Sequence, residues 1–115
     1  MNIERGWVYL AALDPTVGDE ISKTRPVIVI SNDQNNQFST TITVLPVTSA
    51  KLDKIYPFEV FLPTGEANLP KDSKVKTDQV RTLDRSRFLK TIGELCKSRI
   101  TEIEEALKIH LALGT

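Results

Sequence analysis

Short apolar runs separated by polar, turn-forming segments make up most of this chain. The runs are too short for helices and are rich in β-branched and aromatic side chains, which favour strands. They predict five strands, at residues 7–13, 26–30, 40–47, 58–62 and 75–83. Asp78 and Gln79 interrupt the apolar character of the last one. The segments between the runs are rich in Gly, Pro, Asn and Asp and predict loops or turns at residues 14–24, 31–36 and 63–70.

The C-terminal part of the chain has a helical period instead. Apolar side chains recur every three or four residues, at Ile100, Ile103, Leu107 and Leu111. Charged side chains occupy the opposite face, at Glu102, Glu104, Glu105 and Lys108. This spacing predicts an amphipathic helix with Ser98 as its N-cap. Strands followed by one helix indicate an α+β fold, a strongly bent antiparallel sheet or small barrel closed by the helix.

A length of 115 residues fits one domain over residues 1–115, large enough to bury a core without disulfides. Cys96 is the single cysteine, which excludes an internal disulfide and cysteine-rich metal motifs and suits a reducing compartment. The N-terminal residues lack the apolar core of a signal peptide, and no apolar stretch approaches membrane-spanning length. We therefore expect a soluble, cytoplasmic protein that does not associate with membranes.

The charges balance over the whole chain but not along it. Fifteen basic and fifteen acidic side chains give a formal net charge of zero, which argues against binding nucleic acid through a global positive field. Between residues 70 and 90, seven basic side chains stand against three acidic ones, a local excess of four. The basic residues are Lys71, Lys74, Lys76, Arg81, Arg85, Arg87 and Lys90. This run is either an ordinary solvated surface or a binding surface for an acidic partner.

Arg25 lies between Thr24 and Pro26, directly before an apolar run that predicts a buried strand. Proline disfavours helical geometry in the residue before it, so the guanidinium is presented rigidly at the entry of that strand. The next predicted strand runs into Thr48, and if the two strands are neighbours, an arginine and a hydroxyl meet at the rim of the sheet. Such a pair suits phosphate, because the arginine fork binds two phosphoryl oxygens and the hydroxyl donates a further hydrogen bond. The alternative for Arg25 is a structural ion pair at the sheet edge.

Several other classes of catalytic site find no support in the sequence. No cluster of His, Cys and acidic residues has metal-ligand spacing, and phosphate-binding glycine loops and nucleophile elbows are absent. His110 is the only histidine, which excludes ribonuclease chemistry by a histidine pair. We therefore expect neither a metal nor a cofactor. For RNA cleavage the proton acceptor stays open among Glu20, Asp19 and Asp78, because arginine hardly ever deprotonates.

Six short motifs, in order along nearly the whole chain, resemble those of one protein family. They are Arg-Gly at 5–6, Asp-Pro-Thr-x-Gly-x-Glu at 14–20, Thr-Arg-Pro at 24–26, Pro-Val-Thr-Ser at 46–49, Tyr-Pro-Phe-Glu-Val at 56–60 and Asp-Gln-Val-Arg-Thr-Leu-Asp at 78–84. Together they resemble the MazF/PemK (Kid) toxins of type II toxin–antitoxin systems. Each motif alone is weak, but six of them in register, in a short chain that ends in an amphipathic helix, make the resemblance specific.

The resemblance implies an SH3-like, CcdB-like barrel that forms a homodimer. It also implies a sequence-selective, metal-independent endoribonuclease that cuts single-stranded RNA, chiefly mRNA, and so inhibits translation. Cleavage in this family leaves a 2′,3′-cyclic phosphate and a 5′-hydroxyl. The implied protein partner is a cognate antitoxin whose disordered, acidic and apolar tail folds over the RNA groove, which accords with the basic excess at residues 70–90.

The family's functional residues match particular positions here. Arg25 and Thr48 match its usual catalytic pair, and Glu20 matches a loop glutamate that is thought to act as a base in some members. A basic residue and an acid that Kid-type members place just before a glutamine match Lys76 and Asp78. The substrate-binding candidates are Asp19, Ser73, Lys76, Asp78, Gln79 and Arg81.

The loop before Arg25 departs from the family pattern. Residues 18–23 lack the glutamine and the second glycine that family loops often carry, and Asp19 stands where Kid has a histidine. A rival class is the CcdB-like gyrase-binding toxin, which shares the fold and has no nuclease activity. That class depends on a tryptophan near the C-terminus, whereas Trp7 is the only tryptophan here and is expected in the core. An inactive RNA binder is a third possibility, against which Arg25 and Thr48 argue.

Overall fold

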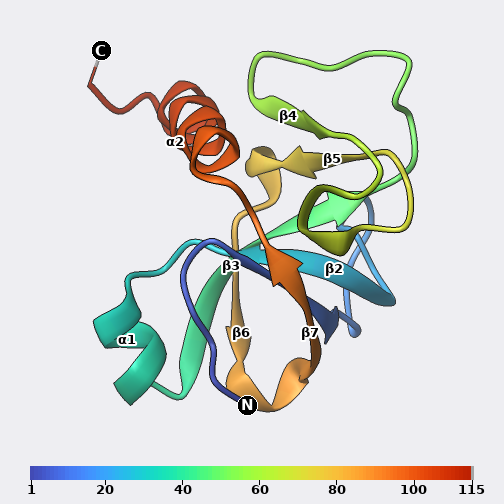
Figure 1. The fold of residues 1–115 in the computed structure, drawn as a ribbon. Coiled ribbons are helices and arrows are strands. Elements are labelled where there is room, and N and C mark those ends of the chain that lie inside the picture. The colour runs from blue at the N-terminus through green and yellow to red at the C-terminus, as the bar shows by residue number, and fades with distance from the viewer. Residues whose placement is uncertain (115) are drawn as a thin grey trace.

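The computed structural model describes residues 1–114, which form seven strands, two α-helices and three 3₁₀ helices. The strands are β1 (Trp7–Ala12), β2 (Thr24–Val29), β3 (Thr41–Thr48), β4 (Glu59–Leu62), β5 (Ser73–Lys76), β6 (Arg81–Asp84) and β7 (Phe88–Glu94). The helices are α1 (Asp33–Phe38), α2 (Lys97–Leu111), η1 (Glu66–Asn68), η2 (Thr77–Gln79) and η3 (Arg85–Arg87). Figure 1 shows α2 beside β4 and β5, with α1 at the far end of the sheet.

Neighbouring strands are antiparallel throughout the sheet, and β3 is its hub. The strand order is β4-β5-β3-β2-β1-β7, and β6 pairs with β3 as well. Residues 41–44 of β3 pair with β6, whereas Val47 and Thr48 pair with β5, so the sheet bends along β3 (Figure 1). The predicted α+β class and bent antiparallel sheet are confirmed. Within residues 1–114 no ladder joins the outer strands β4 and β7, so the barrel is open.

Strand alternation sends the apolar residues to two cores on opposite faces of the sheet. Val8 and Ile28 belong to the core that α2 covers with Ile103. Their strand neighbours Tyr9 and Val27 belong to the second core. Because successive residues of a strand face opposite sides, short runs that are apolar at every position supply both cores at once.

Helix α2 is confirmed, with one correction at its start. Its N-cap is Cys96 and not Ser98, which lies inside the first turn. The chain stays tied to the sheet through Leu95, whose amide donates to the Gly6 carbonyl at 3.1 Å, so the helix begins directly after it. At the other end Leu111 of the predicted apolar face is 48% exposed.

None of the helices in residues 1–114 is long and apolar enough to cross a membrane.

The prediction of a single strand over residues 75–83 is wrong. β5 ends at Lys76, η2 makes a turn, and β6 starts at Arg81. The buried Thr77 hydroxyl donates to the Phe58 carbonyl and fixes this turn against the start of β4. The break lets β5 and β6 pair with different halves of β3.

Two elements lie outside the predicted pattern. Helix α1 falls in a segment predicted as a polar turn, where Asn32 caps it by accepting a hydrogen bond from the Asn35 amide at 2.8 Å. β7 lies at the edge of the sheet and mixes polar with apolar residues, and its Leu89 is 52% exposed. Local capping forms the first element and pairing with β1 forms the second, so neither needs an apolar run.

Gly93 of β7 lies against the backbone of η1. A methyl group at this position would come within 2.4 Å of the Ala67 carbonyl oxygen, so one of the two segments would have to move. We expect Gly93→Ala to lower the free energy of unfolding by about 1–3 kcal/mol, the usual cost of overpacking. Urea unfolding measures this change, and an unchanged midpoint with an unchanged slope would contradict the expected contact.

Candidate active site

Arg25 lies in β2 in extended geometry, as its place before Pro26 predicts. Its Nε donates to the Ser22 carbonyl at 3.1 Å. Within residues 1–114 it forms no ion pair, so the structural alternative of a salt bridge at the sheet edge is not formed. The two terminal nitrogens of the guanidinium make no hydrogen bond to any described residue and are available to an anion.

Thr48 is the last residue of β3, the strand that pairs with β2. Its Oγ1 accepts a hydrogen bond from the Ala50 amide at 3.1 Å, which leaves the hydroxyl hydrogen free to donate. Val27 pairs with Pro46, and the same antiparallel register continued by two residues would set Arg25 opposite Thr48. The two strands are therefore neighbours, as the sequence-based hypothesis requires.

Arg25 and Thr48 nevertheless line different depressions. Arg25 borders a hollow of about 130 Å³ together with Ser73, whose buried hydroxyl donates to the Lys71 carbonyl at 2.9 Å. Thr48 borders a larger groove of about 440 Å³. The lining of that groove is Asp19, Ile21, Thr48, Ala50, Lys51, Lys74, Lys76, Asp78 and Gln79. The groove thus gathers five of the predicted site residues, whereas Glu20 and Arg81 border neither depression.

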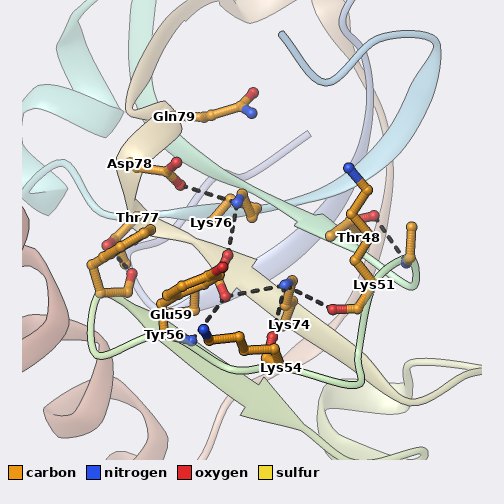
Figure 2. Close-up of polar contacts among 12 residues, drawn as sticks. Thr48, Lys51, Lys54, Tyr56, Glu59, Lys74, Lys76, Thr77, Asp78 and Gln79 are labelled. Carbon is orange, nitrogen blue, oxygen red and sulfur yellow. Dashed lines mark hydrogen bonds and ion pairs between the residues drawn. The ribbon is translucent and has the colours of Figure 1, made fainter. Parts of the chain in front are cut away.

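Three charged side chains beside the groove form one cluster (Figure 2). The side chain of Glu59 is fully buried, and its Oε2 accepts a hydrogen bond from Lys76 Nζ at 2.6 Å. Its Oε1 accepts from Lys74 Nζ at 3.0 Å and from the Tyr56 amide at 3.1 Å. We refer to Glu59, Lys74 and Lys76 as the carboxylate clamp.

The carboxylate clamp follows from the pairing of β4 with β5. Glu59 is opposite Lys76 in that ladder, and Lys74 lies two residues before Lys76, on the same face of β5. Burial raises the pKa of Glu59, but hydrogen bonds from Lys76, the Tyr56 amide and Lys74 outweigh it and hold the pKa below its usual value. Burial lowers the pKa of Lys76, while the hydrogen bond to Glu59 and the charge of Asp78 raise it above its usual value. Glu59 and Lys76 are therefore both ionised at neutral pH.

The η2 turn brings Asp78 and Gln79 to the groove. Asp78 Oδ1 lies 3.6 Å from Lys76 Nζ and, although buried, it has no hydrogen-bond partner within the described residues. Gln79 holds the loop before β2, because its Oε1 accepts from the Ile21 amide at 2.7 Å and its Nε2 donates to the Asp19 carbonyl at 3.3 Å. The side chain of Asp78 is 29% exposed, so its accessible part rather than the buried Oδ1 faces a ligand, whereas the amide of Gln79 is engaged with the chain itself.

The two loop carboxylates differ in their surroundings. Glu20 folds back on its own loop, where its Oε1 accepts a hydrogen bond from the Val17 amide at 2.7 Å. Asp19 is exposed and borders the groove. Of the two, Asp19 is the one that lies beside Thr48 and Asp78.

Much of the basic run at residues 70–90 serves the fold. Three arginines, Arg81, Arg85 and Arg87, donate to backbone carbonyls of Leu13, of Asn36 and Ser39, and of Ala12 and Asp14, respectively. Lys74 is buried in the carboxylate clamp. For these four side chains the interpretation as an ordinary solvated surface is wrong, and the basic excess that reaches solvent is smaller than the sequence suggests.

The remaining candidates lie away from the groove. Trp7 is partly buried against the second core, as predicted. His110 is exposed near the end of α2, with its ring centre 6.2 Å from that of Phe58. Within residues 1–114 no three His, Cys, Asp or Glu side chains are grouped to hold a metal ion.

Glu59 lies in the motif at residues 56–60 and Lys74 in the basic run, but neither is among the predicted site residues. The available signal was alternation with a period of two residues. Glu59 interrupts an apolar run, and Lys74 and Lys76 flank the buried Val75, a spacing that puts both lysines on one face of a strand. Only the pairing of β4 with β5 turns that spacing into a contact.

Known proteins are similar to this one over almost the whole chain. Residues 4–111 match a family described as the PemK-like, MazF-like toxins of type II toxin–antitoxin systems. The chain belongs to this family. Two relatives are each 38% identical to it: endoribonuclease MazF9 of Mycobacterium tuberculosis, over 96% of this chain and 98% of the relative, and endoribonuclease MazF of Staphylococcus epidermidis, over 97% and 93%.

Solved structures of the PemK/MazF family confirm the fold that the resemblance implies. MazF from Deinococcus radiodurans superposes with a TM-score of 0.84 at 29% identity, covering 98% of this chain and 99% of that one. MazF in a MazE–MazF structure from the same organism superposes with a TM-score of 0.77 at 29% identity, covering 99% of both chains.

Proposed function

We propose that this protein is the toxin of a type II toxin–antitoxin pair and that it cuts single-stranded RNA, chiefly mRNA, without a metal ion. The observation that carries the proposal is the family match over residues 4–111, which includes both motifs of the predicted catalytic pair. In the proposed reaction the 2′-hydroxyl attacks the adjacent phosphate. The products are a 2′,3′-cyclic phosphate and a 5′-hydroxyl.

Arg25 and Thr48 stabilise the charge that develops on the phosphoryl oxygens. Two terminal guanidinium nitrogens and a hydroxyl hydrogen are uncommitted at these two positions, which supports this role. Preorganised donors of this kind act without reorganising during the reaction, and a guanidinium adds a full positive charge. The β2–β3 register continued by two residues would set Arg25 opposite Thr48, so the proposed position of the scissile phosphate is at the sheet rim, between the hollow beside Arg25 and the groove beside Thr48.

Of the three carboxylates left open by the sequence, Asp78 is the proposed proton acceptor. It borders the groove with Thr48, and its side chain is 29% exposed there, so part of the carboxylate is accessible to RNA. Glu20 is engaged by its own loop, and Asp19 is an exposed loop residue. Asp78 takes the proton of the attacking 2′-hydroxyl, and Lys76 gives a proton to the departing 5′-oxygen.

The proposed assembly is a homodimer whose partners are RNA and a cognate antitoxin. The Deinococcus radiodurans relative, 29% identical to this chain, is a MazE–MazF structure, which supports an antitoxin partner. An acidic, apolar antitoxin tail would meet a groove whose lining includes Lys51 and Lys76. Gyrase binding gains no support, because Trp7 is partly buried in the core.

The proposed function is tested by incubating the purified protein with transcripts in EDTA and mapping the new 5′-hydroxyl ends. We expect cuts that cluster at one short sequence, since the groove has to read unpaired bases. RNA that stays intact, or cleavage that requires an added divalent metal, would contradict the proposal.

A further inference from the structure

We propose that Glu59 is a positioning residue for RNA cleavage: its buried carboxylate holds the Lys76 ammonium at the groove, ready to protonate the departing 5′-oxygen. The inference rests on the proposed endoribonuclease function. It gives a role in the reaction to a side chain that does not itself reach the RNA, since the side chain of Glu59 is fully buried.

The two lysines of the carboxylate clamp differ in what they have left to donate. Lys74 Nζ has three hydrogens and three acceptors: Glu59 Oε1 at 3.0 Å and the carbonyls of Lys51 and Lys54 at 2.9 and 3.1 Å. Its side chain is 4% exposed. All three N–H groups of Lys74 are therefore engaged, and its ammonium is out of reach of a substrate. Its charge stabilises the buried carboxylate of Glu59.

Lys76 keeps hydrogens for a substrate. Its Nζ donates to Glu59 Oε2 at 2.6 Å and lies 3.6 Å from Asp78 Oδ1, which leaves at least one of its three N–H groups unengaged. The side chain is 19% exposed and borders the same groove as Thr48 and Asp78. Figure 2 shows the Lys76 ammonium between the carboxylates of Glu59 and Asp78.

Glu59 holds the Lys76 ammonium in place through its charge and through its position in the β4–β5 ladder. Glu59 pairs across the ladder with Lys76, so the contact is built from two strands and not from a mobile loop. Lys74 and Lys76 lie two residues apart on one side of β5, and without the Glu59 charge they would lose the carboxylate that both of them contact. Two neighbouring positive charges without a shared carboxylate favour deprotonation of one amine or its movement into solvent. Either outcome removes the proton donor from its place.

The step assigned to Lys76 is balanced without any further reactant. The 2′-oxygen forms a bond to phosphorus while the bond from phosphorus to O5′ breaks, and the electron pair of that bond leaves with O5′. A proton passes from Lys76 Nζ to O5′, and the neutral amine regains a proton from water after Asp78 has released its own. An alkoxide is about as basic as hydroxide and far more basic than a lysine amine, so lysine protonates it readily.

The test compares two leaving groups. The substrate is an oligonucleotide that contains the mapped cut site, made once with the ordinary O5′ and once with sulfur in that bridging position. A thiol has a pKa of about 8.5, so a thiolate leaves without being protonated and needs no general acid. Single-turnover cleavage rates are measured for the wild type, Glu59→Gln, Lys76→Met and the double variant.

We expect Glu59→Gln and Lys76→Met each to slow the cleavage of ordinary RNA about 100-fold or more, the range of general acid catalysis. On the sulfur substrate both variants should cut within about ten-fold of the wild type, because the acid is not needed there. The double variant should be no slower than the single ones by more than about three-fold, since both changes remove the same function. Equal losses on the two substrates would mean that Glu59 only supports the fold and would overturn the inference.

The matched control is Glu105→Gln, which makes the same change on the exposed face of α2 and should leave both rates unchanged. If Glu59→Gln does not fold, Glu59→Asp replaces it: the shorter carboxylate cannot keep both lysine contacts, and it should lose rate on ordinary RNA but not on the sulfur substrate. Wild-type protein that cuts no RNA would overturn the proposed function and the inference with it. Wild-type cleavage together with full activity of Lys76→Met would overturn the inference alone.

Discussion

Arg25→Ala is expected to lower the single-turnover rate of RNA cleavage by about 1,000-fold or more and to leave the fold intact. An arginine that stabilises a phosphoryl transition state is worth about 10³–10⁵ in rate. Within residues 1–114 the Arg25 side chain makes one hydrogen bond, to the Ser22 carbonyl, and no ion pair, so little stability depends on it. The measurement is a cleavage time course on the mapped site, with thermal unfolding of the variant beside it.

Two further variants make the result on Arg25 specific. Arg25→Lys keeps the charge and loses the planar fork, so we expect it to recover only part of the rate. Arg99→Ala is the matched control, because Arg99 lies on α2 and pairs with Glu66 and Glu102 away from the groove. An Arg25→Ala protein that is folded and cuts at the rate of the Arg99→Ala control would contradict the proposed role.

Glu59→Gln is expected to lower the free energy of unfolding by about 3–5 kcal/mol at neutral pH. The reason is the partner it leaves behind: Lys74 is 4% exposed and would keep a buried charge with no carboxylate. Removing one member of a buried pair costs about this much, more than the intact pair contributes. Urea unfolding measures the loss, and Glu105→Gln, an exposed glutamate on α2, should change stability by less than about 0.5 kcal/mol. Equal stability of the two variants would contradict the burial of the carboxylate clamp.

The loss in the free energy of unfolding caused by Glu59→Gln should be smaller at acidic pH than at neutral pH. The pKa of Glu59 is lowered on folding, so its contribution is present above its unfolded value of about 4.3 and is lost as the pH falls through the lowered folded value. The pKa of Lys76 is raised, so its contribution is present below about 10.4 and is lost as the pH rises through the raised folded value. The stability difference between wild type and variant should therefore be steady from about pH 5 to 10 and shrink towards pH 3. A difference that grows on acidification would contradict these directions.

The elements that were predicted correctly are those whose signal is local. β2 and β3 are short runs of apolar residues, and the Ile100 and Ile103 side of α2 repeats at the helical period. β7 carries no such pattern, because it is an edge strand, and the η2 turn is fixed by the buried Thr77 hydroxyl rather than by a glycine or proline. Pairing partners far apart in the sequence decide both, so neither could be read from the segment alone.

The candidate site also has features that a local sequence signal predicts and features that only distant partners decide. The extended geometry of Arg25 follows from Pro26 next to it, and this was predictable. The structural role of the basic run was not predictable from the sequence. A count of charges cannot show that a guanidinium nitrogen of Arg81 donates to the Leu13 carbonyl, 68 residues away in the chain. Glu59 and Lys74 are the reverse case: neither is among the site residues predicted from the sequence, and the register of β4 with β5 places both there.

The most direct test of the account uses one oligonucleotide with the mapped cut site and a second that lacks only the 2′-hydroxyl at the nucleotide before the cut. Both are incubated with the wild-type protein in EDTA, and the ends of the products are identified. The account predicts that the first strand is cut to a 2′,3′-cyclic phosphate and a 5′-hydroxyl and that the second strand stays intact, because the nucleophile is missing. Cleavage of both strands at similar rates, or a 5′-phosphate on the product, would contradict it.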